Sequence, residues 1–267
     1  MPKKNSVAVL GPKGTFTEEA AKKLFPGREL DHCNTVEEVF EAVDNGTEYG
    51  VVAVENSLEG AVNTSMDCLL EHDVGISKEA VLDIHMCLMA PPGTKKEEIK
   101  TILSHSHSFG QCRKYLKKNY PKAALKRYDS NTAAIKELGE LKPKGVAAIG
   151  PGAAAELYGL EILAGGIEDA PSQTRFIAIT KKISTAGKKS SVIFALKDRP
   201  GALYHALKDY ADNGINLTRI ESRPAKKKLG EYSFFIDFEG SLDEDKVKNA
   251  LKSLKEKTIF LKVLGSY

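Results

Sequence analysis

Short hydrophobic runs alternate with polar turns and with helix-like spacing through the first 180 residues. Three of these runs, 6–10, 49–54 and 145–149, are apolar enough to be strands buried on both faces, as in a parallel sheet. Segments with apolar residues at helical spacing follow them. The stretch 76–89 predicts one or two extended strands that cross into a second lobe. The repeat of strand, polar turn and helix therefore predicts a two-lobed α/β architecture with a cleft between the lobes.

The pattern changes after a lysine-rich segment. Strands are predicted at 191–196, 216–222, 231–238 and 258–263, with a turn at 224–230 and helices after Gly201 and Ser241. This βαββαβ order predicts a ferredoxin-like small domain, whose open sheet edges commonly pair with another copy or accept a ligand. We expect a first domain over 1–181, with lobe one at about 1–75 and 164–181 and lobe two at about 76–163. A linker at 182–190 and a second domain over 191–267 follow.

Capping boxes predict where four helices begin. Their members are Thr35 with Glu38, Thr94 with Glu97, Ser108 with Gln111, and Ser241 with Glu244. The turn 11–15 leads from a strand into a helix from about Thr17, and such glycine-rich turns tend to bind anions. It lacks the spacing of a P-loop, so a tight β–α connection explains it equally well.

Polar residues gather where predicted strands begin or end. Glu55, Asn56 and Ser57 follow strand 49–54, at the kind of edge where open α/β sheets bind ligands, although capping by Ser57 is an alternative. Thr174 and Arg175 lie where a loop enters the apolar run 176–179. A hydroxyl beside a guanidinium can meet a small anion there, whereas the alternative is that Thr174 ends a loop and Arg175 lies on the surface.

The segment Ser104 to Ser108 ends a third strand. His105 and His107 have a spacing that suits a metal on a strand, but no third ligand is visible nearby, so we predict no metal. The hydroxyls at the start of the following helix, expected over 109–120, suit an anion. Ser130, Asn131 and Thr132 are predicted to cap a helix over 133–141.

Composition narrows the function classes. The 267 residues are 42% hydrophobic and 28% charged, which is ordinary for a soluble globular protein. Lysine and arginine number 39 against 36 aspartate and glutamate, so nothing favours nucleic acid or an anionic membrane as a partner. No stretch reaches the ~18–20 apolar residues of a membrane helix, and the N-terminal apolar run is too short for a signal sequence. The cysteines Cys33, Cys68, Cys87 and Cys112 form no pattern, which predicts neither zinc nor disulfides and suggests a reducing cytoplasm.

Several motifs together resemble one family. LGPKGTFTEEAA (10–21), VVAVENSLEGAV (51–62), SHSHSFGQC (104–112), DSNTAA (129–134) and TRF (174–176) are similar to the motifs of prephenate dehydratases, in that family's order. RPGAL (199–203) and ESRP (221–224) resemble the signatures of its C-terminal ACT domain. The resemblance covers nearly the whole chain. It implies a periplasmic-binding-protein-like (type 2) catalytic domain followed by a ferredoxin-like ACT domain.

The resemblance implies conversion of prephenate to phenylpyruvate in phenylalanine biosynthesis, with loss of carbon dioxide and water and without a cofactor. It makes Thr174 the central catalytic residue and places Glu55, Asn56, Ser104 and Gln111 with it. The implied substrate-binding residues are Arg175, Phe176, Thr15, Ser57 and Thr132. The chain departs from the family at 104–107, where Ser-His-Ser-His replaces the usual Ser-His-Pro-Gln.

Prephenate loses a hydroxide and a ring carboxylate as its ring becomes aromatic. The protein must offer a donor to the leaving oxygen and a dry wall to the carboxylate, whose charge disappears. We expect Thr174 to donate a hydrogen bond to that oxygen and Arg175 to hold the carboxylate that persists. Glu55 can act as an acid only if burial raises its pKa.

The ACT resemblance implies feedback regulation by phenylalanine at a subunit interface. The expected binding residues are Gly201, Ala202, Leu203, Asn216, Glu221 and Ser222. Edge pairing predicts a homodimer or a homotetramer. Two other functions stay open from the sequence: an arogenate dehydratase, and a non-catalytic sensor of small anions and amino acids.

Overall fold

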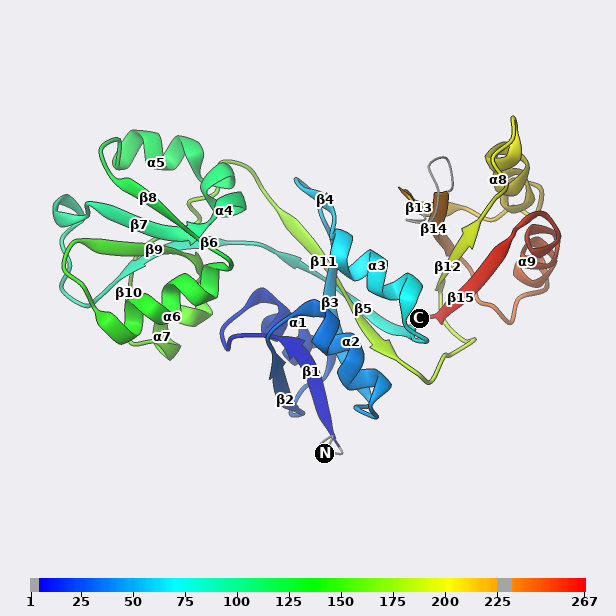
Figure 1. The fold of residues 1–267 in the computed structure, drawn as a ribbon, viewed down its shortest axis with the longest axis horizontal. Helices are drawn as coiled ribbons and strands as arrows, with labels where there is room; N and C mark the ends of the chain where they lie inside the picture. Colours follow the sequence, from blue (N-terminus) through cyan, green and yellow to red (C-terminus); the bar gives the residue numbers. More distant parts are fainter. Residues whose placement is uncertain (1–4, 225–231) are drawn as a thin grey trace.

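The computed structural model describes residues 5–224 and 232–267. Three β-sheets follow one another along the long axis of the molecule, with lobe two at one end, lobe one in the middle and a C-terminal domain at the other end (Figure 1). The predicted two-lobed α/β domain and the βαββαβ domain are both present. None of the helices in the described part of the chain has the length and apolar character needed to span a membrane.

Lobe one has a mixed sheet in the order β2-β1-β3-β11-β5, with β4 attached to β3. Its strands are β1 (Ser6–Leu10), β2 (Glu29–Cys33), β3 (Tyr49–Asn56), β4 (Gly60–Ala61), β5 (Gly75–Asp83) and β11 (Gln173–Thr180). Helices α1 (Phe16–Leu24), α2 (Val36–Asp44) and α3 (Asn63–Glu71) pack against it. Strand β11 returns from lobe two and runs antiparallel to both β3 and β5. The last strand of the first domain is therefore inserted beside β3.

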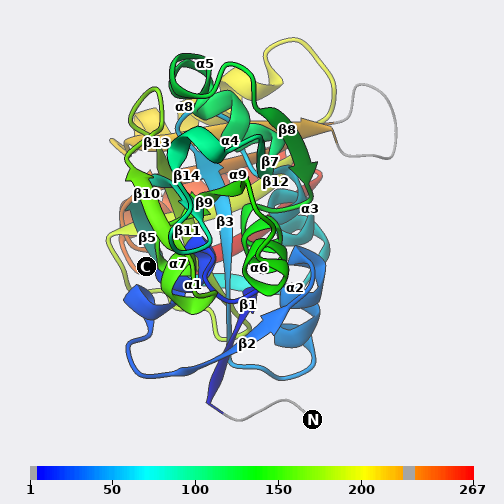
Figure 2. The ribbon, with the colours of Figure 1, turned by 90° about the vertical axis from the view of Figure 1, so that its left-hand side faces the viewer.

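Lobe two has a five-stranded sheet in the order β10-β6-β9-β7-β8. Its strands are β6 (Met86–Ala90), β7 (Thr101–His105), β8 (Ala124–Tyr128), β9 (Val146–Pro151) and β10 (Glu161–Gly165). Its helices are a short 3₁₀ turn at Lys96–Glu98, α4 (Ser106–Gln111), α5 (Arg113–Asn119), α6 (Asn131–Leu141) and α7 (Ala153–Leu157). Figures 1 and 2 show α4 and α5 on one face of this sheet and α6 and α7 on the other.

The C-terminal domain is an antiparallel sheet in the order β13-β14-β12-β15 with two helices on one face. Its elements are β12 (Lys189–Ala195), α8 (Ala202–Asp212), β13 (Leu217–Pro224), β14 (Tyr232–Glu239), α9 (Asp245–Lys257) and β15 (Phe260–Ser266). Its other face packs on lobe one, where Ile193, Phe235 and Leu264 share one buried cluster with Val54 and Met66. The domain is therefore docked through a hydrophobic core.

Several predicted boundaries are wrong for local reasons. Strands β2 and β10 were not predicted, because their residues are largely half-exposed and lack a clear apolar run. The helix expected over 109–120 begins at Ser106 and breaks at Cys112. Most of the predicted turn 224–230, and Glu231 at the predicted start of the next strand, lie outside the described residues. Pro224 ends β13.

Only one of the four predicted capping boxes begins its helix as expected. The Thr35 hydroxyl accepts the backbone N–H of Glu38 at the start of α2. In the other three, the hydroxyls of Thr94 and Ser241 donate to the carbonyls of Pro91 and Thr185, and that of Ser108 donates to Asn131 Oδ1. The Glu244 carboxylate does accept the N–H of Ser241 at 2.7 Å, which is half of the predicted box, but α9 begins only at Asp245. The correction at Ser108 removes the capping explanation for Gln111.

Candidate active site

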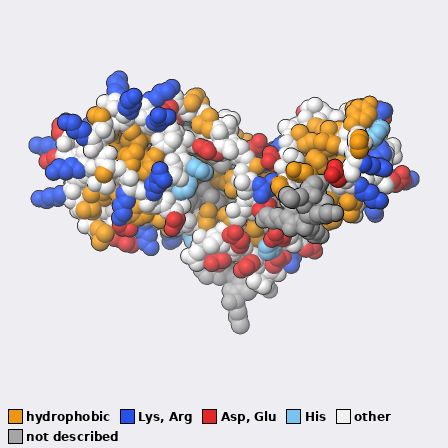
Figure 3. Space-filling view, turned by 45° about the horizontal axis from the view of Figure 1, so that its top comes forward, with side chains coloured by type: hydrophobic (Ala, Val, Ile, Leu, Met, Phe, Trp, Pro, Cys, Tyr) orange, Lys and Arg blue, Asp and Glu red, His pale blue; other side chains and the backbone are white. Residues whose placement is uncertain are grey.

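A cavity of about 520 Å³ lies between the lobes. Its size is within the range of about 300–1,000 Å³ typical of small-molecule sites. Its lining comprises Phe16, Asn56, Glu59, Gly60, Ala61, Val62, Asn63, Ile84, Met86, His105, His107, Ser108, Gln111, Asn131 and Thr174. Figure 3 shows histidine side chains beside the recess between the lobes. Both lobes therefore contribute to one cleft.

The Thr174 hydroxyl is oriented by an amide on the neighbouring strand. Asn56 of β3 lies directly opposite Thr174 of β11 in the sheet, and its Nδ2 donates to Thr174 Oγ1 at 2.9 Å. The same Nδ2 donates to Ser172 Oγ at 3.0 Å, while Asn56 Oδ1 accepts the backbone N–H groups of Leu58 and Glu59. These bonds fix which way the amide faces. Because Thr174 Oγ1 accepts from Asn56, its own proton is available to the cleft.

A second asparagine organises the lobe-two wall. Asn131 Oδ1 accepts the hydroxyls of Ser104 and Ser108, each at 2.9 Å, and the backbone N–H of His105 at 3.0 Å. Ser104 is fully buried, and its single hydroxyl proton is shared between Asn131 Oδ1 and the carbonyl of Ile149. Ser104 thus lies behind the cleft lining, whereas Ser108 and Asn131 line it.

Gln111 has a buried side-chain oxygen without a hydrogen-bond partner. It lies at the end of α4 and lines the cleft. An unpaired buried amide oxygen costs roughly 1–3 kcal/mol, so a site that leaves it open is suited to a ligand that supplies a donor. The break between α4 and α5 at Cys112 ends the helix at this residue.

His105 and His107 lie side by side where α4 begins. Their rings meet edge to face with centroids 4.7 Å apart. In the described part of the chain, no group of three or more histidine, cysteine or acidic side chains is placed to hold a metal ion. Burial, followed by the proximity of His107, lowers the pKa of His105. Since His105 Nδ1 accepts the backbone N–H of His107 at 3.3 Å, the neutral ring carries its proton on Nε2.

Four of the expected substrate-binding residues do not line this cavity. Thr15 caps α1 by accepting the N–H of Glu18 and donates to the carbonyl of Leu10. Ser57 accepts the N–H of Gln173. Thr132 and Phe176 are each about 2% exposed. Phe176 belongs to the core cluster shared by the two lobes.

One backbone donor of the turn 11–15 is already used within the chain. The N–H of Gly14 donates to the Glu18 carboxylate at 2.8 Å. A Cβ at Gly14 would lie 3.1 Å from that of Ala154 in lobe two, and its φ of +88° favours glycine. The turn therefore acts as a close contact between the lobes.

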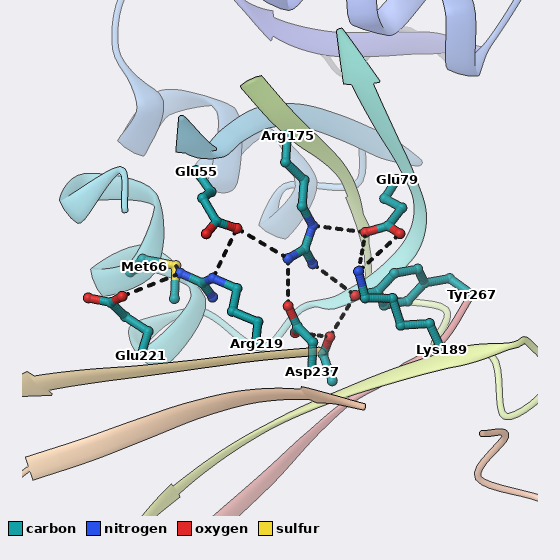
Figure 4. A network of polar contacts seen from close by, with 10 residues as sticks. Glu55, Met66, Glu79, Arg175, Lys189, Arg219, Glu221, Asp237 and Tyr267 are labelled. Atoms are coloured by element: carbon teal, nitrogen blue, oxygen red, sulfur yellow. Dashed lines mark hydrogen bonds and ion pairs between the residues drawn. The ribbon is translucent and has the colours of Figure 1, made fainter. Parts of the chain in front are cut away.

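Arg175 and Glu55 lie on the opposite face of the sheet from Thr174 and Asn56. Side chains alternate along a strand, so neighbours in sequence face opposite ways. Figure 4 shows Arg175 and Glu55 pointing toward the C-terminal domain, where Arg175 pairs with Asp237 at 2.5 Å. The expectation that Arg175 anchors the substrate carboxylate does not fit this placement.

The expected phenylalanine-binding residues are divided between two ends of the C-terminal domain. Gly201, Ala202 and Leu203 begin α8, whereas Asn216 follows its end. The 11 residues of α8 span about 16 Å, so Gly201 and Asn216 of one chain cannot contact the same small ligand. Glu221 and Ser222 lie near the end of the edge strand β13, on opposite faces.

Sequence reasoning missed Ser172 and assigned Asn131 only to a cap. Both are polar residues beside strand ends, but their hydrogen bonds depend on contacts 23 or more residues apart in the chain. The sequence feature that could have identified Asn131 is its position at the N-terminus of α6, directly after the capping residue Ser130.

The lining combines few charges with an apolar wall. Phe16, Val62, Ile84 and Met86 supply the hydrophobic part. Among the described lining residues there is no lysine or arginine, and Glu59 is the acidic member. Such a cleft can donate hydrogen bonds to a small polar molecule while leaving part of it in a dry environment.

Comparisons with known proteins agree with this arrangement. The sequence profile of the prephenate dehydratase family matches residues 7–184, and that of the ACT domain matches residues 190–256. A prephenate dehydratase of Methanocaldococcus jannaschii is 45% identical over 96% of this chain and 95% of its own length. The structure of the Arthrobacter aurescens prephenate dehydratase in complex with L-Phe is 34% identical, with a TM-score of 0.89 over 97% of this chain and 89% of that one. GqqA, described as a novel type of quorum-quenching acylase, is 28% identical, with a TM-score of 0.88 over 97% of this chain and 96% of that one.

Proposed function

This chain belongs to the prephenate dehydratase family and carries a C-terminal ACT domain, and we propose that its cleft converts prephenate to phenylpyruvate with Thr174 as the hydrogen-bond donor. The observation that carries the proposal is the pair Asn56–Thr174, which directs one hydroxyl proton into a cleft shared by both lobes. We also propose 1–181 as the catalytic domain, 182–190 as the linker and 191–267 as the regulatory domain.

The reaction breaks two bonds of the substrate ring. The bond to the ring carboxylate breaks and releases carbon dioxide, its electrons enter the ring, and the ring hydroxyl leaves as hydroxide. Thr174 stabilises the departing oxygen by a hydrogen bond and keeps its own proton, because a threonine hydroxyl is too weak an acid to give it up. The released hydroxide is neutralised by one proton from the medium, so the net reaction converts prephenate and one proton into phenylpyruvate, carbon dioxide and water.

The apolar wall favours the loss of the ring carboxylate. Phe16, Ile84 and Met86 offer no hydrogen bonds to a charge that disappears in the transition state. Gln111 Oε1 can accept a hydrogen bond from a hydroxyl of the substrate. His105 and His107, rather than Arg175, are the side chains in the cleft that can serve the carboxylate that persists, with His105 donating from Nε2.

The direct test is to incubate the purified protein with prephenate and to follow phenylpyruvate. We expect phenylpyruvate to form without added metal or cofactor, and a lower kcat/KM with arogenate than with prephenate. A preference for arogenate would reassign the substrate. Formation of neither product by the folded protein would favour a non-catalytic sensor.

Regulation by phenylalanine is proposed at an interface between two copies. Because Gly201 and Asn216 lie at opposite ends of α8, a complete site needs Gly201 to Leu203 from one copy and Asn216 from another, with Glu221 and Ser222 on the edge strand between them. This supports a homodimer or homotetramer, which we place in the cytoplasm because the four cysteines form no disulfide. Activity that does not respond to phenylalanine at any concentration would remove the regulatory part.

A further inference from the structure

Arg175 is the centre of a buried ion network between the catalytic sheet and the ACT sheet (Figure 4). Its side chain is 11% exposed. Its Nε lies 2.8 Å from a Glu79 carboxylate oxygen, and its Nη1 lies 2.5 Å from Asp237. Its Nη2 donates to the Tyr267 hydroxyl at 3.1 Å. Every nitrogen of the guanidinium is thus directed to a partner on the side of the sheet away from the cleft.

The ACT side of this network is itself rigidly held. Asp237 of β14 is 6% exposed at its side chain and accepts the Ser191 hydroxyl on its other oxygen at 2.5 Å. Ser191 Oγ also lies 2.6 Å from Tyr267 Oη. Asp237 raises the pKa of Arg175 above its usual value against the opposing effect of burial. The counter-ion of Arg175 is therefore held by Ser191, which is in turn hydrogen-bonded to Tyr267.

Further ion pairs cross the interface on both sides of Arg175. Glu55 pairs with Arg219 of β13 at 3.2 Å, and Glu79 pairs with Lys189 of β12 at 2.9 Å. Glu221 lies 4.0 Å from Arg219, so that with Arg175 and Asp237 the network has three cations and four carboxylates. Removing Asp237 leaves the largely buried guanidinium of Arg175 without its shortest ion pair, which is costly.

The catalytic pair and this network belong to neighbouring residue pairs of the β3–β11 strand pairing. Thr174 lies opposite Asn56, and Arg175 lies opposite Glu55, in the β3–β11 ladder. A register shift in the ladder follows Arg175, and such irregularities commonly re-aim side chains next to active sites. A movement of Arg175 is therefore passed to Thr174 through a single peptide unit.

The space behind Arg175 leaves little room for independent movement. The cavity that Arg175, Arg219 and Asp237 line between the two sheets measures about 10 Å³, which holds at most one water molecule. Close-packed interiors transmit small displacements instead of absorbing them. The position of the ACT sheet is therefore imposed on β11.

We propose that Arg175 is a positioning residue that acts through Thr174, and that Asp237 and Tyr267 of the ACT domain complete the active site from behind. This inference rests on the proposed dehydratase function. It assigns a role in the reaction to ACT residues that touch no substrate, and it explains why a guanidinium follows the catalytic threonine directly. Arg175 holds no substrate carboxylate.

The test compares Asp237→Asn and Tyr267→Phe with Lys262→Met in the full-length protein. Lys262 of β15 crosses the same interface by donating to the carbonyl of Leu69 at 2.9 Å, but none of its hydrogen bonds reaches β3 or β11. We expect kcat for prephenate to fall at least about tenfold in Asp237→Asn, because small misplacements of a catalytic group have effects of this size. KM should change less than about twofold, and Lys262→Met should keep the wild-type kcat. Tyr267→Phe, which loses only a hydroxyl, should show a smaller fall in kcat.

Amide hydrogen exchange gives a second readout that needs no turnover. The peptide 173–180 should exchange faster in Asp237→Asn than in the wild type, and at the wild-type rate in Lys262→Met. The proposal is overturned if both network variants match Lys262→Met in kcat and in exchange. It is also overturned if KM rises while kcat is kept, since that result would link the network to substrate binding and not to the position of Thr174. An inactive wild-type protein would count against the proposed function alone, and the exchange data would still decide this inference.

Discussion

Asn56 determines where the Thr174 proton points. Its Oδ1 is held by two backbone N–H groups, so its Nδ2 faces Thr174 and Ser172. The direction of this one hydrogen bond decides whether Thr174 can donate to a substrate. The proposed chemistry therefore depends on the orientation of one residue pair, Asn56 and Thr174.

Asn56→Asp tests that direction with almost no change of shape. Aspartate keeps the acceptor for the N–H groups of Leu58 and Glu59 but offers no donor to Thr174. Thr174 would then donate to the carboxylate and turn its proton from the cleft. We expect kcat to fall about 10²-fold or more. Steady-state kinetics with prephenate measures it, and a kcat within threefold of wild type would show that the orientation is unimportant.

Glu18 gives lobe one a defined sensitivity to acid. Burial would raise its pKa, but hydrogen bonds from Lys22, the Gly14 N–H and His32 outweigh burial and lower the pKa to about 2. A carboxylate whose pKa is lower in the folded state stabilises the protein above its unfolded pKa of about 4.5 and loses that effect as the pH falls towards 2.

Glu18→Gln should therefore be less stable than the wild type at pH 7, and the difference should shrink between pH 4.5 and pH 2. Urea unfolding at several pH values measures this. The matched control is Glu19→Gln, a change at the exposed neighbouring position in the same helix turn, which should follow the wild-type curve. A constant difference at every pH would show that the effect is not one of ionisation.

At the scale of elements, β3 and β11 organise the whole site. Each extends past its apolar run, so that Glu55, Asn56, Thr174 and Arg175 are strand residues with alternating directions. The sequence indicated polar groups at these positions and the cleft between two lobes. The sequence could not indicate that Thr174 and Arg175 face opposite sides of the sheet, because the predicted strand 176–179 began after both residues.

Other misassignments have the same cause. Local patterns predicted most elements, since apolar runs and helical spacing reflect burial directly. They failed where a contact distant in sequence decides the structure: Ser108 donates to Asn131, not to its own helix, and Arg175 meets Asp237 of another domain. Long-range polar partners leave no periodic trace in the sequence.

The ACT domain packs so closely against Gly75 of β5 that any side chain at this position would clash. A Cβ there would lie 2.4 Å from the Leu264 carbonyl and 2.6 Å from Ile183 Cγ1. Gly75→Ala should destabilise the protein by about 1–3 kcal/mol through overpacking. Denaturant unfolding measures it, with Gly110→Ala as the control because a Cβ at Gly110 meets no atom within 4 Å. Equal stability of the two variants would contradict the proposed close docking.

At the scale of the whole molecule, three sheets form a continuous series from lobe two to the ACT domain (Figure 1). One buried cluster joins the two lobes and a second joins lobe one to the ACT domain. A ligand that binds differently to two arrangements of the ACT domain can therefore alter the cleft.

The proposed shared phenylalanine site predicts complementation between subunits. Gly201→Val, at a φ of +79°, and Asn216→Leu should each abolish inhibition by phenylalanine. Mixed assemblies that contain both variants should regain part of it, because one interface then combines an intact Gly201 with an intact Asn216. Measuring prephenate turnover against phenylalanine concentration tests this, and mixtures as insensitive as their parents would place the site within one chain.

The central claim is that the Thr174 hydroxyl serves the departing oxygen in the cleft between the lobes. Turnover of prephenate to phenylpyruvate by Thr174→Val and Thr174→Ser tests it most directly, since valine keeps the shape and removes the donor. We predict a fall in kcat of about 10²–10³-fold for Thr174→Val with an unchanged fold, and partial activity for Thr174→Ser. Turnover by Thr174→Val close to that of the wild type would contradict the account.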